Sequence, residues 1–255
     1  MTNSSKTYSP DTLYATHLEK VDQFSFNQQV VNVFPDMINR SVPGYQTIID
    51  GIGKLAALHI KRNAITQATI YDLGCSLGSV SLSVAKHINN KAARIIGIDN
   101  SEAMIAQCRQ HISAFNFSDS IELYFGDLTE VNISNCDIVV MNFTLQFIDR
   151  KKRDSIIQKI FDALKPGGML ILSEKIKHDE GELDQVLVSL HHDFKRENGY
   201  SDLEISQKRS ALEDVMILDS VSTHQARLVQ AGFTSSSLWF QQYNFMSLLA
   251  IKGKP

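Results

Sequence analysis

Three acidic residues each close or follow a short run of β-branched and aliphatic residues. Asp72, Asp99 and Asp127 hold these positions, and such runs predict buried strands. In an open α/β sheet, ligands bind at the carboxyl ends of the strands, so we expect the three carboxylates to gather around one ligand. A carboxylate there attracts a cationic ligand and can accept hydrogen bonds from hydroxyl groups.

A glycine turn separates the first predicted strand from the helix that follows it. Gly74 allows a positive φ and a close approach of ligand to backbone, and Gly78 allows the helix to pack closely. A dinucleotide fingerprint reads G-x-G-x-x-G, whereas this turn reads G-x-x-x-G with Asp72 in front. The pattern is close to the D-x-G-x-G-x-G loop of Rossmann-like methyltransferases, which bind S-adenosylmethionine, although Ser76 replaces the middle glycine. An ordinary strand-to-helix turn of another α/β protein is the alternative.

The other strand ends supply groups for the rest of a nucleoside. Asp99 lies about 27 residues after Asp72 and can accept hydrogen bonds from both ribose hydroxyls. The turn that contains Asp127 offers a carboxylate and a backbone amide to an adenine edge. Asn142 ends a fourth predicted strand, and the residues after it, 143–147, should line the cleft.

The remaining pattern predicts an α/β protein with a Rossmann-like seven-stranded methyltransferase sheet. The last two strands, 237–243 and 245–251, are joined by a link too short for a crossover helix, so they must form an antiparallel hairpin. The segment 176–220 is helical by pattern and contains a capping box at 201–204. We expect it to be an insertion over the carboxyl edge of the sheet, for substrate and dimer contacts. The other expected elements are strands near 68–72, 94–99, 121–125, 136–142 and 169–173, and helices near 24–34, 45–63, 79–85, 101–115 and 150–164.

Composition excludes several classes of protein. The chain has 255 residues and a net charge of −3, without a dense basic stripe, so we expect no direct binding of nucleic acid. No apolar run is long enough to span a membrane. Three scattered cysteines and a polar beginning without a signal-peptide core indicate a cytoplasmic protein. We expect residues 1–20 to be a mobile segment and 21–255 to form a single methyltransferase-like domain.

Other residues that could bind a metal or act as a nucleophile give only weak signals. His191 and His192 are adjacent, so on a helix they point about 100° apart, and no cysteine and histidine cluster has metal-ligand spacing. We therefore expect no metal and interpret the histidines as part of a solvated helix surface. Cys75 has no evident base that would make it a nucleophile. Lys208 and Arg209 could be solvated helix charges.

Several stretches go beyond a general methyltransferase pattern and resemble the carboxy-S-adenosyl-L-methionine synthase family. The resemblance covers nearly the whole chain except about the first twenty residues. It rests on 33–38, 40–45, 71–78, 142–147, 191–196 and, as the longest match, 203–210.

This resemblance implies conversion of S-adenosylmethionine and prephenate to carboxy-S-adenosylmethionine and phenylpyruvate by a homodimer. A second enzyme then uses the product to modify a wobble uridine of tRNA. The resemblance also assigns the carboxylate of the product to Arg209, because an arginine beside a sulfonium requires an anion between them. The implied ligand contacts are Tyr45, Gly74, Cys75, Ser76, Asp99, Asn100, Asp127, Leu128, Asn142 and Arg209, the last also as the catalytic residue. An ordinary methyltransferase and a non-catalytic S-adenosylmethionine-binding protein are the alternatives.

Overall fold

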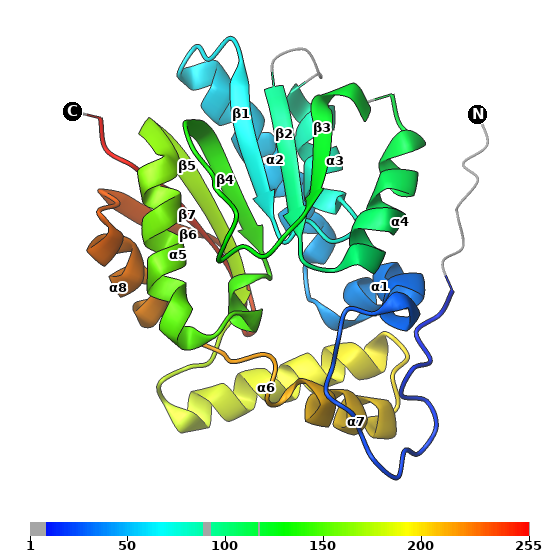
Figure 1. The fold of residues 1–255 in the computed structure, drawn as a ribbon. Helices are drawn as coiled ribbons and strands as arrows, with labels where there is room; N and C mark the ends of the chain where they lie inside the picture. Colours follow the sequence, from blue (N-terminus) through cyan, green and yellow to red (C-terminus); the bar gives the residue numbers. More distant parts are fainter. Residues whose placement is uncertain (1–8, 89–92, 117, 255) are drawn as a thin grey trace.

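Seven strands form one mixed sheet in the computed structural model, which describes residues 9–88, 93–116 and 118–254 (Figure 1). The strand order is β3-β2-β1-β4-β5-β7-β6, and β7 runs in the direction opposite to the other strands of this sheet. The strands are β1 Ala68–Leu73, β2 Ala93–Asp99, β3 Ile121–Phe125, β4 Cys136–Asn142, β5 Leu164–Lys175, β6 Ser235–Gln242 and β7 Phe245–Ile251. The predicted α/β sheet with an antiparallel terminal hairpin is confirmed.

Helices cover both faces of this sheet, because its central strands are apolar on both sides. One face packs against α2 (Tyr45–Arg62), α3 (Ser79–Ile88) and α4 (Glu102–Ser113). The other packs against α5 (Arg150–Ala163) and α8 (Val221–Ala231). In β4, every residue before Asn142 is buried. The sheet is therefore a rigid support for whatever its strand ends carry.

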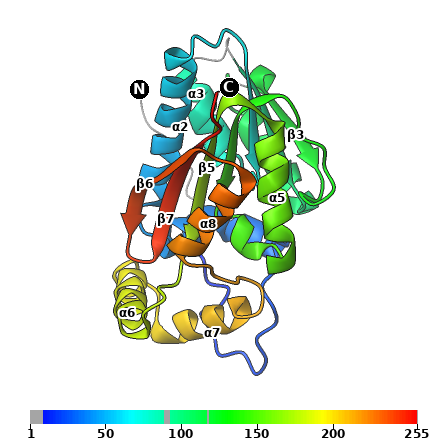
Figure 2. The ribbon, with the colours of Figure 1, turned by 90° about the vertical axis from the view of Figure 1, so that its left-hand side faces the viewer.

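Three further helices lie beyond the carboxyl ends of the parallel strands (Figures 1 and 2). They are α1 (Gln28–Ser41), α6 (Gly181–Glu197) and α7 (Asp202–Leu212). The predicted capping box is present at the start of α7. The Ser201 hydroxyl accepts a hydrogen bond from the Glu204 N–H at 3.3 Å, and the Glu204 carboxylate accepts one from the Ser201 N–H at 2.7 Å. None of the described helices is long and apolar enough to cross a membrane.

The predicted bounds of two elements are wrong at both ends. The helix expected at 24–34 begins at Gln28, because the Asn27 side chain caps it by accepting a hydrogen bond from the Val30 N–H at 3.1 Å. It continues through Pro35 to Ser41, since its apolar face keeps packing over that length. The strand expected at 169–173 spans Leu164–Lys175, because β4 pairs with it at Leu164 and β7 pairs with it as far as its last residue.

The segment before α1 makes defined contacts from Asp11 onward. The Asp11 N–H donates to the Asp36 carboxylate at 2.6 Å, and the Tyr200 hydroxyl donates to the Asp11 carboxylate. The Leu18 N–H donates to the Gln207 side chain at 2.7 Å. Residues 1–8 of the segment predicted to be mobile lie outside the described ranges. Its mobility and the single domain over 21–255 stay predictions.

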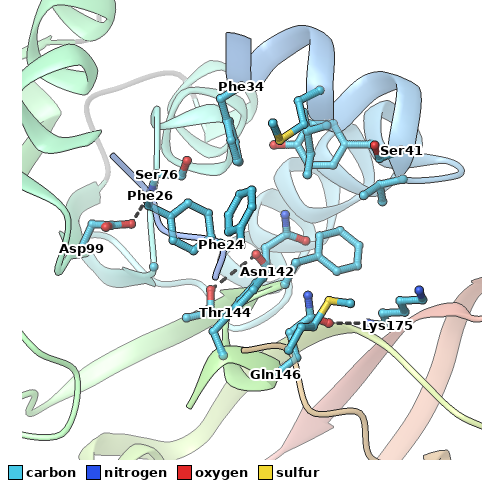
Figure 3. A pocket seen from close by; sticks show the side chains of 18 of the residues that line it. Phe24, Phe26, Phe34, Ser41, Ser76, Asp99, Asn142, Thr144, Gln146 and Lys175 are labelled. Carbon is cyan, nitrogen blue, oxygen red and sulfur yellow. Dashed lines mark hydrogen bonds between the residues drawn. The ribbon is translucent and has the colours of Figure 1, made fainter. Parts of the chain in front are cut away.

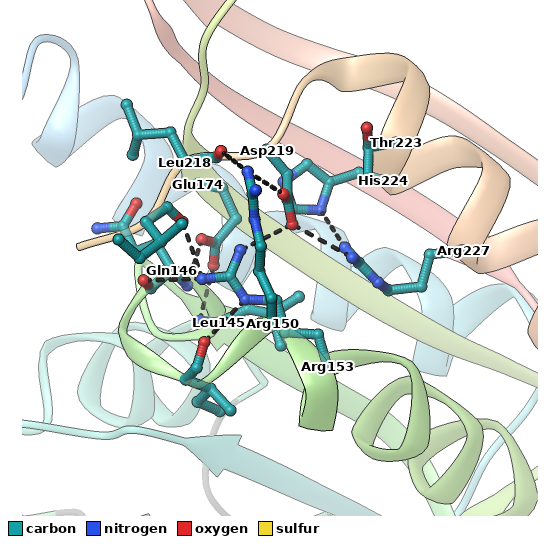
Figure 4. A network of polar contacts seen from close by, with 12 residues as sticks. Leu145, Gln146, Arg150, Arg153, Glu174, Leu218, Asp219, Thr223, His224 and Arg227 are labelled. Atoms are coloured by element: carbon teal, nitrogen blue, oxygen red, sulfur yellow. Dashed lines mark hydrogen bonds and ion pairs between the residues drawn. The ribbon is translucent and has the colours of Figure 1, made fainter. Parts of the chain in front are cut away.

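One buried carboxylate ties the chain after α7 to α5 and α8 (Figure 4). Asp219 accepts from Arg153 at 2.7 Å and from Arg227 at 3.2 Å through one oxygen, and its other oxygen pairs with Arg150 at 3.0 Å. Arg153 is fully buried and also donates to the backbone carbonyl of Gln146 at 3.0 Å. The network therefore holds the loop after β4 in place.

Candidate functional site

A cavity of about 220 Å³ opens at the carboxyl ends of β1 and β4, where the strand order reverses direction (Figure 3). This switch point is the usual ligand site of open α/β sheets. The loop after β4 supplies part of its wall, including Thr144 and Gln146, as 143–147 was predicted to do. Glu174 fixes that loop by accepting hydrogen bonds from two of its amides, at 2.9 and 2.7 Å, and burial raises the pKa of Glu174 to about 8.

The glycine turn brings backbone to the cavity. Gly74 has a φ of +80°, and a Cβ there would lie 2.3 Å from the Thr144 hydroxyl oxygen. Only glycine fits this position. The Gly74 and Cys75 amides donate to the Ile98 carbonyl at 2.8 and 3.0 Å, which fixes the turn against β2. Gly78, predicted to let α3 pack on the strand, instead faces Cys108 of α4, whose sulfur would lie 2.8 Å from an added Cβ.

Asp99 sits beside this turn and helps to hold it. One carboxylate oxygen accepts from the Ser76 N–H at 2.9 Å, and the other accepts from the Ser101 N–H at 2.9 Å. An ionised carboxylate offers about four lone-pair sites, so both oxygens keep capacity for a ligand. Burial raises the pKa of Asp99, and the two backbone hydrogen bonds oppose that shift. The geometry is suited to a pair of ribose hydroxyls.

Two buried oxygens at the cavity have no hydrogen-bond partner among the described residues. They are one carboxylate oxygen of Asp72 and the amide oxygen of Asn142. The second oxygen of Asp72 accepts from the Ser81 amide at 3.1 Å and hydroxyl at 2.6 Å. Burial raises the pKa of Asp72 to about 6, despite those hydrogen bonds. Unsatisfied acceptors beside a cavity suit a cationic or amine-bearing ligand.

Most of the residues predicted to contact ligand line this one cavity. They are Tyr45, Gly74, Cys75, Ser76, Asp99, Asn100, Asp127, Leu128 and Asn142. Hydrogen bonding to Cys108 and burial raise the pKa of Cys75 well above its usual value. Cys75 is therefore a neutral wall residue at neutral pH and a poor nucleophile.

The other end of the cavity is basic. Lys175 of β5, Lys195 of α6 and Lys208 of α7 line it, together with His191. His191 is 2% exposed, and its Nε2 donates to the Ser41 carbonyl at 2.8 Å. The interpretation of this histidine as solvated helix surface is wrong, and so is the interpretation of Lys208 as a solvated charge, since it is 5% exposed.

Sequence reasoning missed Lys175 and Lys195. Lysine is the commonest solvated residue on a helix, so its type carried no signal. One signal was available, because His191 and Lys195 are four residues apart and share a helix face. The aromatic wall of Phe24, Phe26 and Phe34 was also missed (Figure 3).

Arg209 is the one predicted contact that does not line the cavity. Its side chain is exposed on α7. Its charge nevertheless lies near enough to lower the pKa of Lys175, after the larger effect of burial. The ligand role of Arg209 therefore stays a proposal. Among the described residues, no group of three or more histidine, cysteine or acidic side chains has the arrangement of a metal site.

The sheet order, the glycine turn and the acidic cavity define the class I methyltransferase fold. A methyltransferase domain model matches residues 70–168. An O-methyltransferase family protein from Burkholderia thailandensis superposes with a TM-score of 0.66 at 17% identity, over 92% of this chain and 66% of that chain. Human N-acetylserotonin methyltransferase superposes with a TM-score of 0.57 at 15% identity, over 89% of this chain and 56% of that chain. At such identities these structures show the fold alone.

Relatives with similar sequences show which family within this fold class the chain belongs to. Carboxy-S-adenosyl-L-methionine synthase from Colwellia psychrerythraea is 51% identical over 95% of this chain and 98% of its own length. The synthases from Salmonella typhimurium and Aliivibrio salmonicida are 51% and 48% identical over 95% of this chain, and over 97% and 99% of their own lengths. The chain belongs to the carboxy-S-adenosyl-L-methionine synthase family and is a transferase of that type.

Replacing Asp99 by alanine should weaken S-adenosylhomocysteine binding by about ten- to a hundredfold, because hydrogen bonds to a charged group contribute roughly 1.5–3 kcal/mol. Calorimetry measures the dissociation constant, and thermal unfolding checks that the fold persists. Glu102→Ala, an exposed acid three residues away, is the matched control and should bind as wild type does. Equal affinities for Asp99→Ala and wild type would remove Asp99 from the site.

Proposed function

We propose that this protein converts S-adenosylmethionine and prephenate to carboxy-S-adenosylmethionine and phenylpyruvate. The observation that supports this most is the polarity of the cavity. One end carries Asp72 and Asp99, which suit a cationic donor, and the other carries Lys175 and Lys195, which suit an anionic second substrate. A methyl acceptor that is neutral would need no such basic end.

The proposed chemistry balances without a further reagent. Prephenate loses carbon dioxide and its ring hydroxyl, the methyl group on sulfur loses a proton, and the resulting carbanionic carbon captures the carbon dioxide. The departing hydroxyl takes the methyl proton and leaves as water, so we assign no protein general base. The residues of this chain bind and orient the reactants, and Arg209 is proposed to hold the new carboxylate.

We propose further that the chain is a cytoplasmic homodimer that supplies the carboxymethyl donor for a tRNA wobble uridine and does not itself bind tRNA. An apolar stripe on α6 supports the dimer. Leu183, Val186 and Leu190 share one face of that helix and are 52%, 52% and 40% exposed. The net charge of −3 supports the absence of tRNA binding.

Incubation with S-adenosylmethionine and prephenate, followed by mass spectrometry, tests the reaction. We expect a donor whose mass is raised by one carbon dioxide, together with phenylpyruvate. Methylation of an acceptor without that product would favour an ordinary methyltransferase. Donor binding without turnover in either assay would favour a non-catalytic S-adenosylmethionine-binding protein.

A further inference from the structure

Of the three lysines that line the cavity, two have no counter-ion among the residues that the structure describes. Lys208 pairs with the Asp11 carboxylate at 3.3 Å and donates to the Ser41 hydroxyl at 3.0 Å. The ammonium groups of Lys175 and Lys195 have no ion pair or hydrogen bond to any described residue, and Lys175 lies 5.7 Å from the centre of the Phe245 ring. Lys195 is 7% exposed, and Lys175 is partly buried. A lysine is rarely buried unless it is paired, because an isolated buried charge is unfavourable.

Burial and neighbouring positive charges surround these two ammonium groups, so a bound anion would stabilise them. Burial, followed by the charges of Lys175 and Lys208, lowers the pKa of Lys195 to about 7. Burial, followed by the charge of Arg209, lowers the pKa of Lys175 to about 8. The titratable and charged groups that face this pair are Lys208 and Arg209 of α7, Asp184, His191 and His192 of α6, and Asp11.

We propose that Lys175 and Lys195 together bind the pyruvyl carboxylate of prephenate, the carboxylate that is kept in phenylpyruvate. This inference rests on the proposed function, which supplies the substrate. Prephenate carries a second carboxylate, on its ring, which departs as carbon dioxide. An ammonium on the departing carboxylate would stabilise the ground state more than the transition state and slow the reaction. Cations are better placed on the carboxylate that persists.

The assignment separates these lysines from the donor subsite. The donor also has a carboxylate, in its methionine part, which is a competing occupant of the pair. The two occupants differ in what a lysine substitution changes. If the pair serves prephenate, removing an ammonium leaves donor affinity intact, whereas if it serves the donor, donor affinity falls and phenylpyruvate affinity does not.

The experiment uses wild type, Lys175→Met and Lys195→Met, each loaded with S-adenosylhomocysteine, which lacks the methyl group and so allows no turnover. Methionine keeps an unbranched side chain that is one atom shorter, and it removes the charged ammonium group with its N–H donors. Calorimetry measures the dissociation constants of prephenate and phenylpyruvate. We expect both to rise roughly 30-fold or more in each variant, with S-adenosylhomocysteine binding unchanged. Lys177→Met, an exposed lysine two residues from Lys175, is the matched control and should match wild type.

A second measurement depends on charge and not on packing. A bound carboxylate raises the pKa of both lysines, so phenylpyruvate binding should take up protons near pH 7–8 and weaken as the pH rises above that range. Proton uptake appears as a binding heat that depends on the ionisation enthalpy of the buffer. It should fall in Lys175→Met and in Lys195→Met.

The outcomes distinguish the two levels of the proposal. If wild type neither binds nor converts prephenate, the proposed function and this inference both fail. If wild type converts prephenate but both methionine variants bind phenylpyruvate as wild type does, the inference alone fails. It also fails if S-adenosylhomocysteine binding is lost in place of phenylpyruvate binding, or if only prephenate binding weakens, which would assign the lysines to the ring carboxylate.

Discussion

Replacing Asp219 by alanine should lower the free energy of unfolding by about 3–5 kcal/mol, because it leaves buried arginines without their carboxylate. Arg153 is fully buried, and its guanidinium lies 2.7 Å from Asp219. Arg227 is 8% exposed and shares the same carboxylate oxygen at 3.2 Å. The cost comes from uncompensated charge in a low-dielectric interior, and not from the loss of one favourable contact.

Urea denaturation of wild type and variant gives this difference directly. Asp154→Ala is the matched control, since Asp154 pairs with Arg227 at 2.6 Å but is 60% exposed. Its loss should lower stability by about 1 kcal/mol or less. Asp219→Asn keeps the shape of the side chain, and its free energy of unfolding should lie between those of Asp219→Ala and Asp154→Ala. If Asp219→Ala is no less stable than Asp154→Ala, backbone carbonyls alone stabilise the buried arginines. The predicted cost of uncompensated charge would then be wrong.

The sheet was predictable because its strands are strongly patterned. β3 was placed without error at 121–125, and the terminal hairpin followed from the short link between its strands. The glycine turn and Asp99 were also predictable, since their roles depend on local backbone and on strand ends. The predicted ends of helices and strands were wrong where tertiary packing decides them. The helix predicted at 24–34 ends before Pro35, yet α1 runs through this proline because the face around Met37 is buried.

The basic end of the cavity could not be predicted from the sequence. Burial of a lysine depends on which elements pack over it, and Lys175, Lys195 and Lys208 come from β5, α6 and α7. Each looks like an ordinary solvated residue in its own helix or strand. Only the insertion, folded over the strand ends, turns three separate charges into one basic wall.

Replacing Arg209 by alanine should leave S-adenosylmethionine affinity nearly unchanged and weaken binding of carboxy-S-adenosylmethionine by roughly 2–5 kcal/mol, if the pair is desolvated in the complex. Arg209→Lys should recover only part of this, because an ammonium cannot form the two parallel hydrogen bonds of a guanidinium. Synthesis from prephenate should fall in both variants.

The measured quantity is the ratio of the two dissociation constants. Arg196→Ala, which removes an exposed arginine paired with Asp193 and Asp202, is the control. If the ratio in Arg209→Ala equals that of wild type, Arg209 is a solvated surface charge without a ligand role.

The exposed position of Arg209 leaves two ways for it to reach a carboxylate. Its side chain could turn toward the cavity of its own chain, or it could enter the cavity of the second subunit in the proposed homodimer. Mixing Asp99→Ala with Arg209→Ala subunits separates these routes. Across the dimer, one site of the mixed species has an intact Asp99 and receives an intact Arg209, so activity returns at limiting donor concentration. If Arg209 acts within its own chain, every site lacks either Asp99 or Arg209, so the mixture stays as inactive as each variant alone.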